Sequence, residues 1–402
     1  MRYDATMKKT LPGNIQNRQQ RTLLGGTTTH QFLVEYWQKK PLLIRAAYPD
    51  FPGLLNADEL AGLACEEDAQ SRLVMNRQGK WQVESGPFAE TRFAKLPKKD
   101  WTLLVQGVNH HLPEAAALLQ RFNFIPQARL DDLMVSYAPD GGGVGPHFDS
   151  YDVFLLQGQG KRLWRISEQD DLTLVDGAPL RILKNFKAEQ EYLLEAGDML
   201  YLPPHVAHWG VAVGECMTYS IGFRAPSAQE LATQFLAYMQ EHLSLEGMYA
   251  DPDLKPQKHP AKISDEMVGR VAGMLKKIRW DKRDVANFLG SYLSEPKNNV
   301  LFESPAKMGL GDFLKHLRSK GIALDLESQA LFHGKQFFIN GEQIAMQTGY
   351  ADALKLLADQ RYVAALSFKD KNFASLDSDL GLVNILYQWY QDGYLQFPHT
   401  GG

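Results

Sequence analysis

The spacing of apolar positions changes along the chain and divides it into parts. From about residue 30 to 225, short apolar runs are separated by Gly, Pro and Asp, which is typical of an all-β sandwich or barrel. Helices are predicted over Ala57–Cys65 and Trp101–Leu119, which precede the predicted strands. The predicted strands are Leu133–Tyr137, Tyr151–Gln157, Arg162–Ile166, Glu191–Leu194, Met199–Leu202 and Met217–Phe223.

Helical spacing begins after Pro226, with an S-x-x-E capping box that starts at Ser227. Residues 251–263 are rich in Pro, Lys and Asp and are predicted to be a linker, and a third helix is predicted over Asp284–Leu293. The apolar stripes are Leu231, Phe235 and Met239 in the first helix and Met267, Val268, Val271, Met274, Leu275 and Ile278 in the second. Stripes this wide on short helices need a partner, which is either the barrel or a second copy of the chain.

The last hundred residues predict helices around a hairpin. The helices are expected at Ala306–Lys320, Tyr350–Asp359 and Asp379–Tyr390, and Asn340-Gly341 is a two-residue hairpin signal. This order suggests a winged-helix-like module. Residues 301–402 hold 9 Lys and Arg against 11 Asp and Glu, so they lack the basic footprint of a DNA-reading wing. A protein-contact or structural role is therefore expected.

Composition narrows the class of protein. The chain has 402 residues, 44% hydrophobic and 22% charged, which is ordinary for a soluble protein of two or three domains. Its formal net charge of −4 gives no global basic field. The only cysteines, Cys65 and Cys216, exclude a disulfide scaffold and a cysteine zinc site. Residues 1–25 are polar and are expected to be a disordered extension without a secretory signal, and no apolar run could span a bilayer. We expect a cytoplasmic protein.

A glycine-rich run, GGGVGPHFD, ends in His147 and Asp149 before an apolar, strand-like run. In a strand, residues i and i+2 point to the same face, so this imidazole and this carboxylate can converge. They are two thirds of the 2-His-1-carboxylate arrangement that holds non-heme iron. The third ligand is expected after Pro203-Pro204, where His205 and His208 compete. We favour His208 because it adjoins a predicted strand, Trp209–Val213.

The other metal pattern common in such barrels is H-x-H followed by Glu and His. Here the second position is Asp149, and no Glu follows within several residues. The pattern therefore favours an iron/2-oxoglutarate site over a cupin isomerase site.

A 2-oxoglutarate site also needs a cation for the distal carboxylate of the cosubstrate. If Gln157–Gly160 forms a tight turn, Leu155 lies opposite Arg162, which then shares the face of His147 and Asp149. Lys161 and Arg165 would face the other way and replace Arg162 if the turn is off by one residue. A straight strand would separate the two sites by about 20 Å, so we expect a bend near Ser150 or a turn at the H-x-D.

Together, GGGVGPHFDSYDVFLLQGQGKRLWRI, GDMLYLPPHVAHWG and YSIGFRAP resemble the JmjC-type ribosomal oxygenases, protein hydroxylases of the cupin superfamily. The likeness runs from about Phe32 through FLVEYWQKKPLLIR, DELAGLA, SRLV, GKWQVESGPF and DDLMVS to Pro226, roughly half of the chain. It is strongest to the bacterial enzymes that hydroxylate an arginine of a large-subunit ribosomal protein. The C-terminal third resembles the family in layout more than in sequence.

The resemblance implies an α+β protein: a double-stranded β-helix (jelly-roll, cupin) barrel at 26–226, a helical dimerisation segment at 227–300 and a winged-helix-like domain at 301–402. It implies His147, Asp149 and His208 as Fe(II) ligands, and Arg162 and Ser136 as 2-oxoglutarate contacts. The expected partners are a ribosomal protein and a second copy of the chain, with no direct nucleic-acid binding and no membrane.

Two functions of other kinds stay open. One is a regulator whose barrel senses a metabolite and whose winged helix binds DNA. The other is an enzyme of the same superfamily that demethylates lysine or hydroxylates histidine. An arginine substrate calls for aromatic faces and carboxylates near the iron. The residues near the motif that could line such a cleft are Tyr137, Tyr151, Asp140 and Asp152.

Overall fold

The computed structural model describes residues 23–77, 79–297, 300–365 and 380–398. Contacts divide the chain into two compact units, with the boundary between Ala225 and Pro226. Most of the predicted N-terminal extension lies outside the described residues. Its last part does not, and there Leu23 and Leu24 are buried in the core of the first unit. None of the helices in the described ranges is long and apolar enough to cross a membrane.

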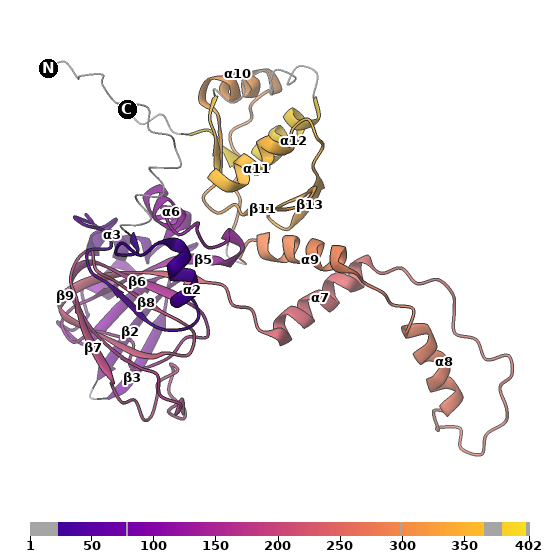
Figure 1. The fold of residues 1–402 in the computed structure, drawn as a ribbon, viewed down its shortest axis with the longest axis horizontal. Helices are drawn as coiled ribbons and strands as arrows, with labels where there is room; N and C mark the ends of the chain where they lie inside the picture. The colour runs from indigo at the N-terminus through magenta and orange to yellow at the C-terminus, as the bar shows by residue number, and fades with distance from the viewer. Residues whose placement is uncertain (1–22, 78, 298–299, 366–379, 399–402) are drawn as a thin grey trace. The chain divides into compact units, whose positions relative to one another are not determined.

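The first unit is built on one nine-stranded, curled antiparallel sheet (Figure 1). The strands follow the order β1-β8-β6-β9-β5-β4-β2-β3, and β7 also pairs with β6. The strands are β1 (Leu42–Ile44), β2 (Ser71–Arg77), β3 (Lys80–Ser85), β4 (Trp101–Val105), β5 (Leu130–Ala138), β6 (Val153–Ser167), β7 (Gln190–Leu194), β8 (Met199–Leu202) and β9 (Ala207–Phe223). The helices are α2 (Thr29–Glu35), α3 (Ala57–Leu63), α4 (Glu90–Phe93), α5 (Val108–His111) and α6 (Pro113–Gln120).

The two faces of this sheet have different environments. Side chains alternate between faces along a strand. Phe154 of β6 packs in the main apolar core, together with Phe32 of α2 and Leu60 of α3. Its neighbours Val153 and Leu155 point the other way and line a cavity. The helices therefore cover the face that carries Phe154, and the face that carries Val153 and Leu155 lines the cavity.

The predicted strands at 133–137, 191–194 and 199–202 are confirmed by β5, β7 and β8. The predicted helix Trp101–Leu119 is wrong, because its first part is β4. Trp101–Val105 is a short apolar run, which periodicity alone cannot assign, and it pairs with β2 and β5 on both sides. The left-handed Gly107 (φ 64°) and Pro113 at the start of α6 then break the rest into two short helices.

The predicted hairpin at Gln157–Gly160 is also wrong. β6 runs unbroken through these residues and pairs with β9 along most of its length, with irregularities between Gln157 and Lys161. β9 is likewise one strand where two, Trp209–Val213 and Met217–Phe223, were predicted. A central strand flanked on both edges can absorb glycines as bulges, because its neighbours hold the extended backbone.

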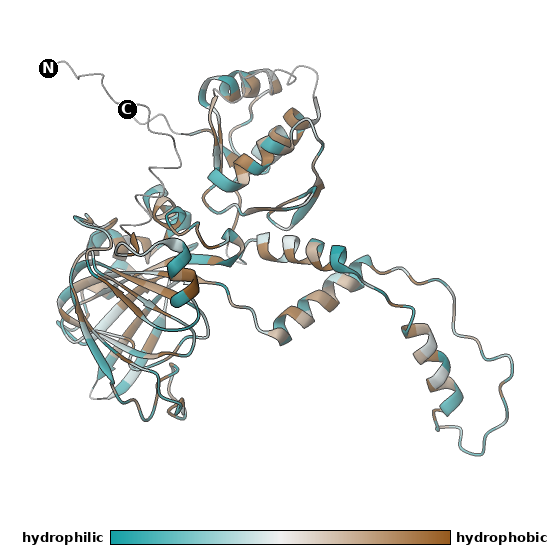
Figure 2. Cartoon of the chain, in the orientation of Figure 1, coloured by the Kyte–Doolittle hydropathy of each residue, from teal (hydrophilic) through white to brown (hydrophobic). Residues whose placement is uncertain are grey.

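The second unit starts with three helices, α7 (Ala228–His242), α8 (Asp265–Leu275) and α9 (Lys282–Ser294). The predicted capping box is present, since the amide of Glu230 donates to Ser227 Oγ at 3.1 Å. Residues 251–263 form neither helix nor strand, as predicted for a linker. Figure 2 shows hydrophobic residues on α7 and α8.

The remaining elements of this unit share a second apolar core. They are α10 (Leu310–Lys320), β10 (Ile322–Leu324), β11 (Ala330–His333), β12 (Gln336–Ile339), β13 (Glu342–Ala345), α11 (Ala351–Gln360), β14 (Tyr362–Val363), α12 (Leu380–Gln391) and β15 (Leu395–Gln396). The predicted hairpin is confirmed: Asn340 (φ 50°) and Gly341 (φ 88°) join β12 to β13. α9 packs on this hairpin, where a Cβ on Gly290 would come within 2.3 Å of the Phe338 ring.

Candidate active site

The three expected metal ligands come from two segments that main-chain hydrogen bonds hold together. His147 and Asp149 lie in the loop between β5 and β6, so they are not in a straight strand, and the expected bend near Ser150 is present. His208 lies at the start of β9. The amide of His147 donates to the carbonyl of His208 (2.9 Å), and that of His208 donates back (2.7 Å). The amide of His205 donates to the carbonyl of Asp149 (2.7 Å). The loop is thus fixed on both sides of Phe148, to β9 through His147 and to the turn before β9 through Asp149.

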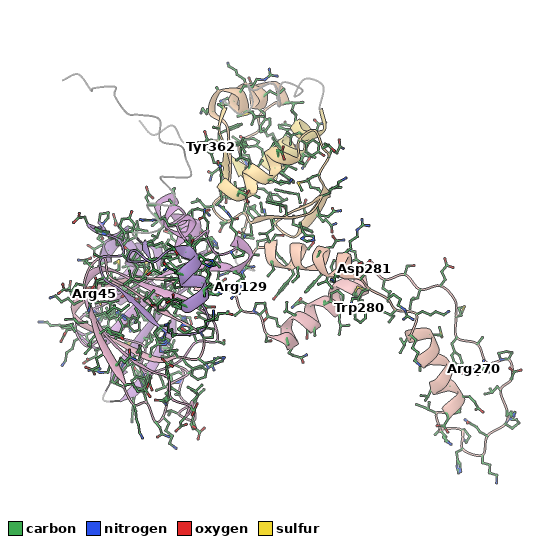
Figure 3. The ribbon with its side chains drawn as sticks, in the orientation of Figure 1. Arg45, Arg129, Arg270, Trp280, Asp281 and Tyr362 are labelled. Atoms are coloured by element: carbon green, nitrogen blue, oxygen red, sulfur yellow. The ribbon has the colours of Figure 1, made fainter. Side chains whose placement is uncertain are left out.

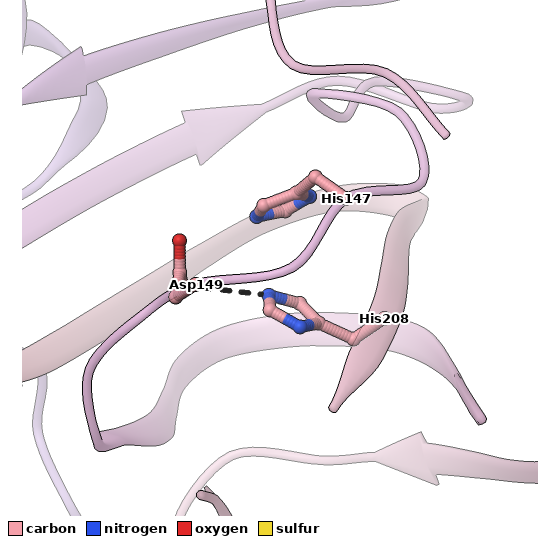
Figure 4. A group of neighbouring side chains, drawn as sticks. All are labelled: His147, Asp149 and His208. Carbon is pink, nitrogen blue, oxygen red and sulfur yellow. Dashed lines mark ion pairs between the residues drawn. The ribbon is translucent and has the colours of Figure 1, made fainter. Parts of the chain in front are cut away.

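The three side chains point toward one another (Figure 4). One ligand atom from each lies within 4.8 Å of the others, and His208 Nε2 is 3.7 Å from Asp149 Oδ2. Among the residues that the structure describes, this is the one group of three His, Cys, Asp or Glu side chains close enough to share a metal ion. His205 does not join it, because it is exposed and lies in the preceding turn with φ 68°.

Both imidazoles are oriented for metal binding. His147 Nδ1 lies 2.9 Å from the carbonyl oxygen of Gly145, and His208 Nδ1 lies 2.9 Å from that of Val206. A carbonyl oxygen only accepts, so each Nδ1 donates its proton there and each Nε2 is the ring atom left to bind a metal. Burial lowers the pKa of His208 to about 4, with the neighbouring His147 adding to the effect, so this ring is neutral at pH 7. A carboxylate and two imidazoles suit a divalent iron ion.

The three ligands lie on the wall of a cavity of about 680 Å³. The other face of the sheet supplies most of the wall, and the segment between β6 and β7 supplies another part. The residues from the sheet are Arg72, Val74, Thr102, Leu104, Asp131, Asp132, Met134, Ser136, Val153, Leu155, Arg162, Trp164, Thr218, Ser220 and Gly222. This volume is within the range of small-molecule sites and exceeds that of one five-carbon diacid.

Arg162 lies in this cavity without a protein counter-charge. Its side chain is 3% exposed, and its Nε and Nη2 atoms have no hydrogen-bond partner among the described residues. Leaving buried donors of a charged group unpaired costs free energy, so the site is suited to an anionic ligand. Lys161 and Arg165 point elsewhere and form ion pairs of 2.6 Å with Glu195 and Glu191, respectively.

Arg162 faces the cavity, as predicted, but the hairpin that was predicted to place it there is absent. Leu155 was expected opposite Arg162, whereas it pairs with Leu200 and Ser220. Between Gln157 and Gln159, two steps along β6 match one step along β9. This bulge shifts the alternation of side chains along β6 by one residue. Leu155 and Arg162 are an odd number of positions apart, and the shift lets both of them face the cavity.

Ser136 also lines the cavity and is buried, as expected of a cosubstrate contact. Its neighbour across the sheet is Thr218 of β9, which sequence reasoning missed, as it missed Ser220. The signal for both was present, since Thr218 and Ser220 alternate with large apolar residues from Met217 to Phe223. Thr102 had no such signal because β4 was predicted to be a helix, and Arg72 had none because no strand was predicted where β2 lies.

Of the four residues expected near a substrate, only Tyr151 lines the cavity. Tyr137 and Asp140 do not line it, and Asp152 is fully buried elsewhere, where it accepts from the Tyr201 hydroxyl at 2.6 Å. Burial and then the charge of Asp149 raise the pKa of Tyr151 above its usual range, so its hydroxyl stays protonated. The carboxylates that line the cavity besides Asp149 come from β5 and were not anticipated: Asp131 and Asp132.

Known proteins match this chain over most of its length. The JmjC domain family matches residues 117–231, and the ROXA-like winged helix family matches residues 277–396. The ribosomal protein uL16 3-hydroxylase of Escherichia coli K12 is 35% identical over 371 residues, which are 90% of this chain and 97% of that protein. A probable ribosomal oxygenase of Haemophilus influenzae is 38% identical over 61% of this chain and 60% of that protein.

A solved structure matches as well. YcfD, a ribosomal oxygenase from Escherichia coli in complex with cobalt and 2-oxoglutarate, has a TM-score of 0.78 and 33% identity, over 92% of this chain and 97% of that one. These matches confirm the predicted order of a JmjC-type barrel followed by a winged helix.

Proposed function

Because this chain belongs to the JmjC-type ribosomal oxygenases, we propose that it is an Fe(II)- and 2-oxoglutarate-dependent hydroxylase of an arginine on a large-subunit ribosomal protein. The proposed class of reaction rests on one observation. Two histidines and an aspartate converge on the wall of a cavity that also holds a buried arginine without a counter-charge. We assign catalysis to 26–226, dimerisation to 227–300 and a protein-contact role to 301–402. We propose that it acts in the cytoplasm, because its proposed substrate is a ribosomal protein.

The residues present fit both groups that the family requires. His147, Asp149 and His208 would hold Fe(II), with their orientation fixed by the carbonyls of Gly145 and Val206. Arg162 would pair with the distal carboxylate of 2-oxoglutarate, and Ser136 would add a hydroxyl. When bound, these two groups supply the oxidation: one atom of O₂ enters a substrate C–H bond as hydroxyl, and the other enters succinate as 2-oxoglutarate loses CO₂.

The cavity wall also suits an arginine substrate. The Tyr151 side chain is 41% exposed and offers an aromatic surface, and Asp131 and Asp132 add carboxylates from β5. A guanidinium binds aromatic faces and carboxylates favourably. No proton needs to be taken from the substrate by a side chain, so we assign no general base. The chain's own residues position the substrate carbon and limit the access of water.

The substrate is tested by mass. Ribosomal proteins from cells with and without this gene are compared as intact chains and then as peptides. We expect one large-subunit protein to be about 16 Da heavier when the gene is present, with the added oxygen confined to one arginine-bearing peptide. Oxygen on a histidine, a loss of methyl groups from lysine, or no difference would contradict the proposal. Binding to duplex DNA that controls a gene, with no mass change, would favour a regulator instead.

Exposure of apolar side chains supports α8 as the proposed dimer surface. In α7, Phe235 is half-buried, and its ring lies 5.4 Å from that of Phe288 in α9. In α8, Val268 is 56% exposed and Leu275 is 58% exposed, and no α8 residue is buried. An apolar stripe left in water on a short helix is destabilising unless a partner covers it. We therefore propose that α8 pairs with a second copy of the chain.

Sedimentation velocity at micromolar concentration is expected to show a dimer. The double variant Val268→Glu/Leu275→Glu is expected to sediment as a monomer, because it places charge in the contact. The matched control is Gly269→Glu/Gly273→Glu, which adds the same charge on the opposite side of α8, where nothing lies within 4 Å. A monomeric wild type, or equal effects of the two double variants, would show that the stripe does not form the dimer.

A further inference from the structure

The junction between α8 and α9 is strongly basic, although the whole chain carries a formal net charge of −4. Five cations occur within eight positions, in the sequence KKIRWDKR, and all five are exposed. They are Lys276, Lys277, Arg279, Lys282 and Arg283. The only acidic residue inside this run is Asp281, which caps the N-terminus of α9. The acidic balance of residues 301–402 therefore does not describe this surface, which precedes that range.

Four of these cations have no role in the fold that the structure shows. Within the part of the chain that it describes, Lys276, Lys277, Lys282 and Arg283 form no ion pair. Lys282 and Arg283 occupy the first turn of α9, where the positive end of the helix dipole disfavours cations. Arg279 differs, because it donates to backbone carbonyls at the end of α8, among them that of Ile278 at 2.9 Å. Local stability thus does not explain the other four.

An exposed indole lies among these charges. Trp280 is 58% exposed and immediately precedes the cap of α9 (Figure 3). Its ring meets that of Phe235 edge to face, with centroids 5.7 Å apart, so α7 supports the indole from one side. A supported but exposed aromatic ring between cations is the arrangement that binds unpaired bases.

We propose that this basic junction, residues 276–283, binds single-stranded RNA. The cations would follow the phosphate backbone, and a base would stack on Trp280. A lipid surface is the less suitable occupant if the apolar stripe of α8 is covered by a second copy of the chain, and this choice alone rests on the dimer proposed above. The proposal stands on charge and exposure and does not depend on the reaction proposed above. Its consequence is that the enzyme meets its protein substrate where RNA is present.

The test uses the full-length protein and a fluorescently labelled 20-nucleotide oligouridine, with binding followed by polarisation. Four phosphate contacts predict that log K falls with log salt concentration with a slope of about −3. Lys276→Glu/Lys277→Glu and Lys282→Glu/Arg283→Glu are each expected to weaken binding at least tenfold and to flatten the slope. Trp280→Ala is expected to cost ~5- to 150-fold, and Trp280→Phe much less, because it keeps a stacking ring.

The matched control is Lys98→Glu/Lys99→Glu, an equal charge reversal at exposed lysines of the first unit. It is expected to bind RNA nearly as the wild type does. Equal losses in the control and in the junction variants would show a general charge effect and overturn the proposal. So would absence of binding at 50 mM salt, or capture by anionic phospholipid vesicles without binding of RNA. Hydroxylation of a short substrate peptide should stay unchanged in the junction variants, which separates this result from the enzymatic one.

Discussion

Replacing Asp149 by alanine is expected to abolish hydroxylation. Asp149 supplies the only carboxylate of the three converging groups, and its oxygen lies 3.7 Å from His208 Nε2. Losing a residue that only orients a metal ligand typically costs 10- to 100-fold in affinity, so losing the ligand itself should cost more than about 100-fold. Anaerobic titration with Co(II), followed by its absorption spectrum, measures this affinity, and succinate formation measures turnover.

His205→Ala is the control for this experiment. His205 adjoins the same loop but is exposed and is not one of the three converging groups, so its loss should leave metal affinity within a few fold of wild type. An Asp149→Ala protein that has unchanged metal affinity and still converts 2-oxoglutarate would contradict the assignment of Asp149 as a metal ligand. Loss of metal binding in His205→Ala, with His208→Ala unaffected, would show that His205 and not His208 is the third ligand.

Replacing Arg162 by methionine is expected to raise the KM for 2-oxoglutarate steeply. The lost contact is a charge-assisted pair, worth about 1.5–3 kcal/mol, which corresponds to ~10- to 150-fold. Co(II) affinity should be unchanged, because Arg162 is not a ligand. Methionine roughly keeps the length of the side chain, so packing against Trp164 is largely preserved. Initial rates at varied 2-oxoglutarate concentrations give the effect.

The same variant makes a second prediction, on stability. Without cosubstrate, Arg162 is a buried charge whose Nε and Nη2 lack partners, and removing such a charge should raise Tm. Added 2-oxoglutarate should then raise the Tm of the wild type but hardly that of the variant. Arg165→Met is the control, since its guanidinium pairs with Glu191 outside the cavity. A larger KM effect in Arg165→Met or Lys161→Met would refute the role of Arg162.

The sequence was most informative where one short segment carries the whole signal. The capping box at Ser227 and the turn at Asn340-Gly341 each need only local backbone chemistry, and both are confirmed. The H-x-D at His147 marked the right segment, although it lies in a loop and not in the expected strand. The barrel and winged helix followed from the order of such segments and from the family resemblance. Local chemistry of this kind does not depend on which strands become neighbours.

Features set by strand pairing were not predictable in this way. Trp101–Val105 became a strand because β2 and β5 flank it, although its apolar spacing also fits a helix. The bulge in β6 decides which cations face the cavity, and the glycines beside it, Gly158 and Gly160, fit a tight turn as well as a bulge. Arg72 and Thr102 reach the cavity wall from β2 and β4, strands that lie far from the H-x-D in the sequence. Such residues are found only once the register is known.

The main-chain bonds between the His147 loop and the start of β9 have a consequence for handling the enzyme. They join peptide groups, not side chains, so they remain when the ion dissociates. A preformed site of this kind need not refold to take up metal. Iron lost to a chelator or to oxidation should therefore be replaceable by simple addition of fresh Fe(II), within the time of mixing and without denaturant. The metal-free protein would then regain its activity as soon as reduced iron is supplied.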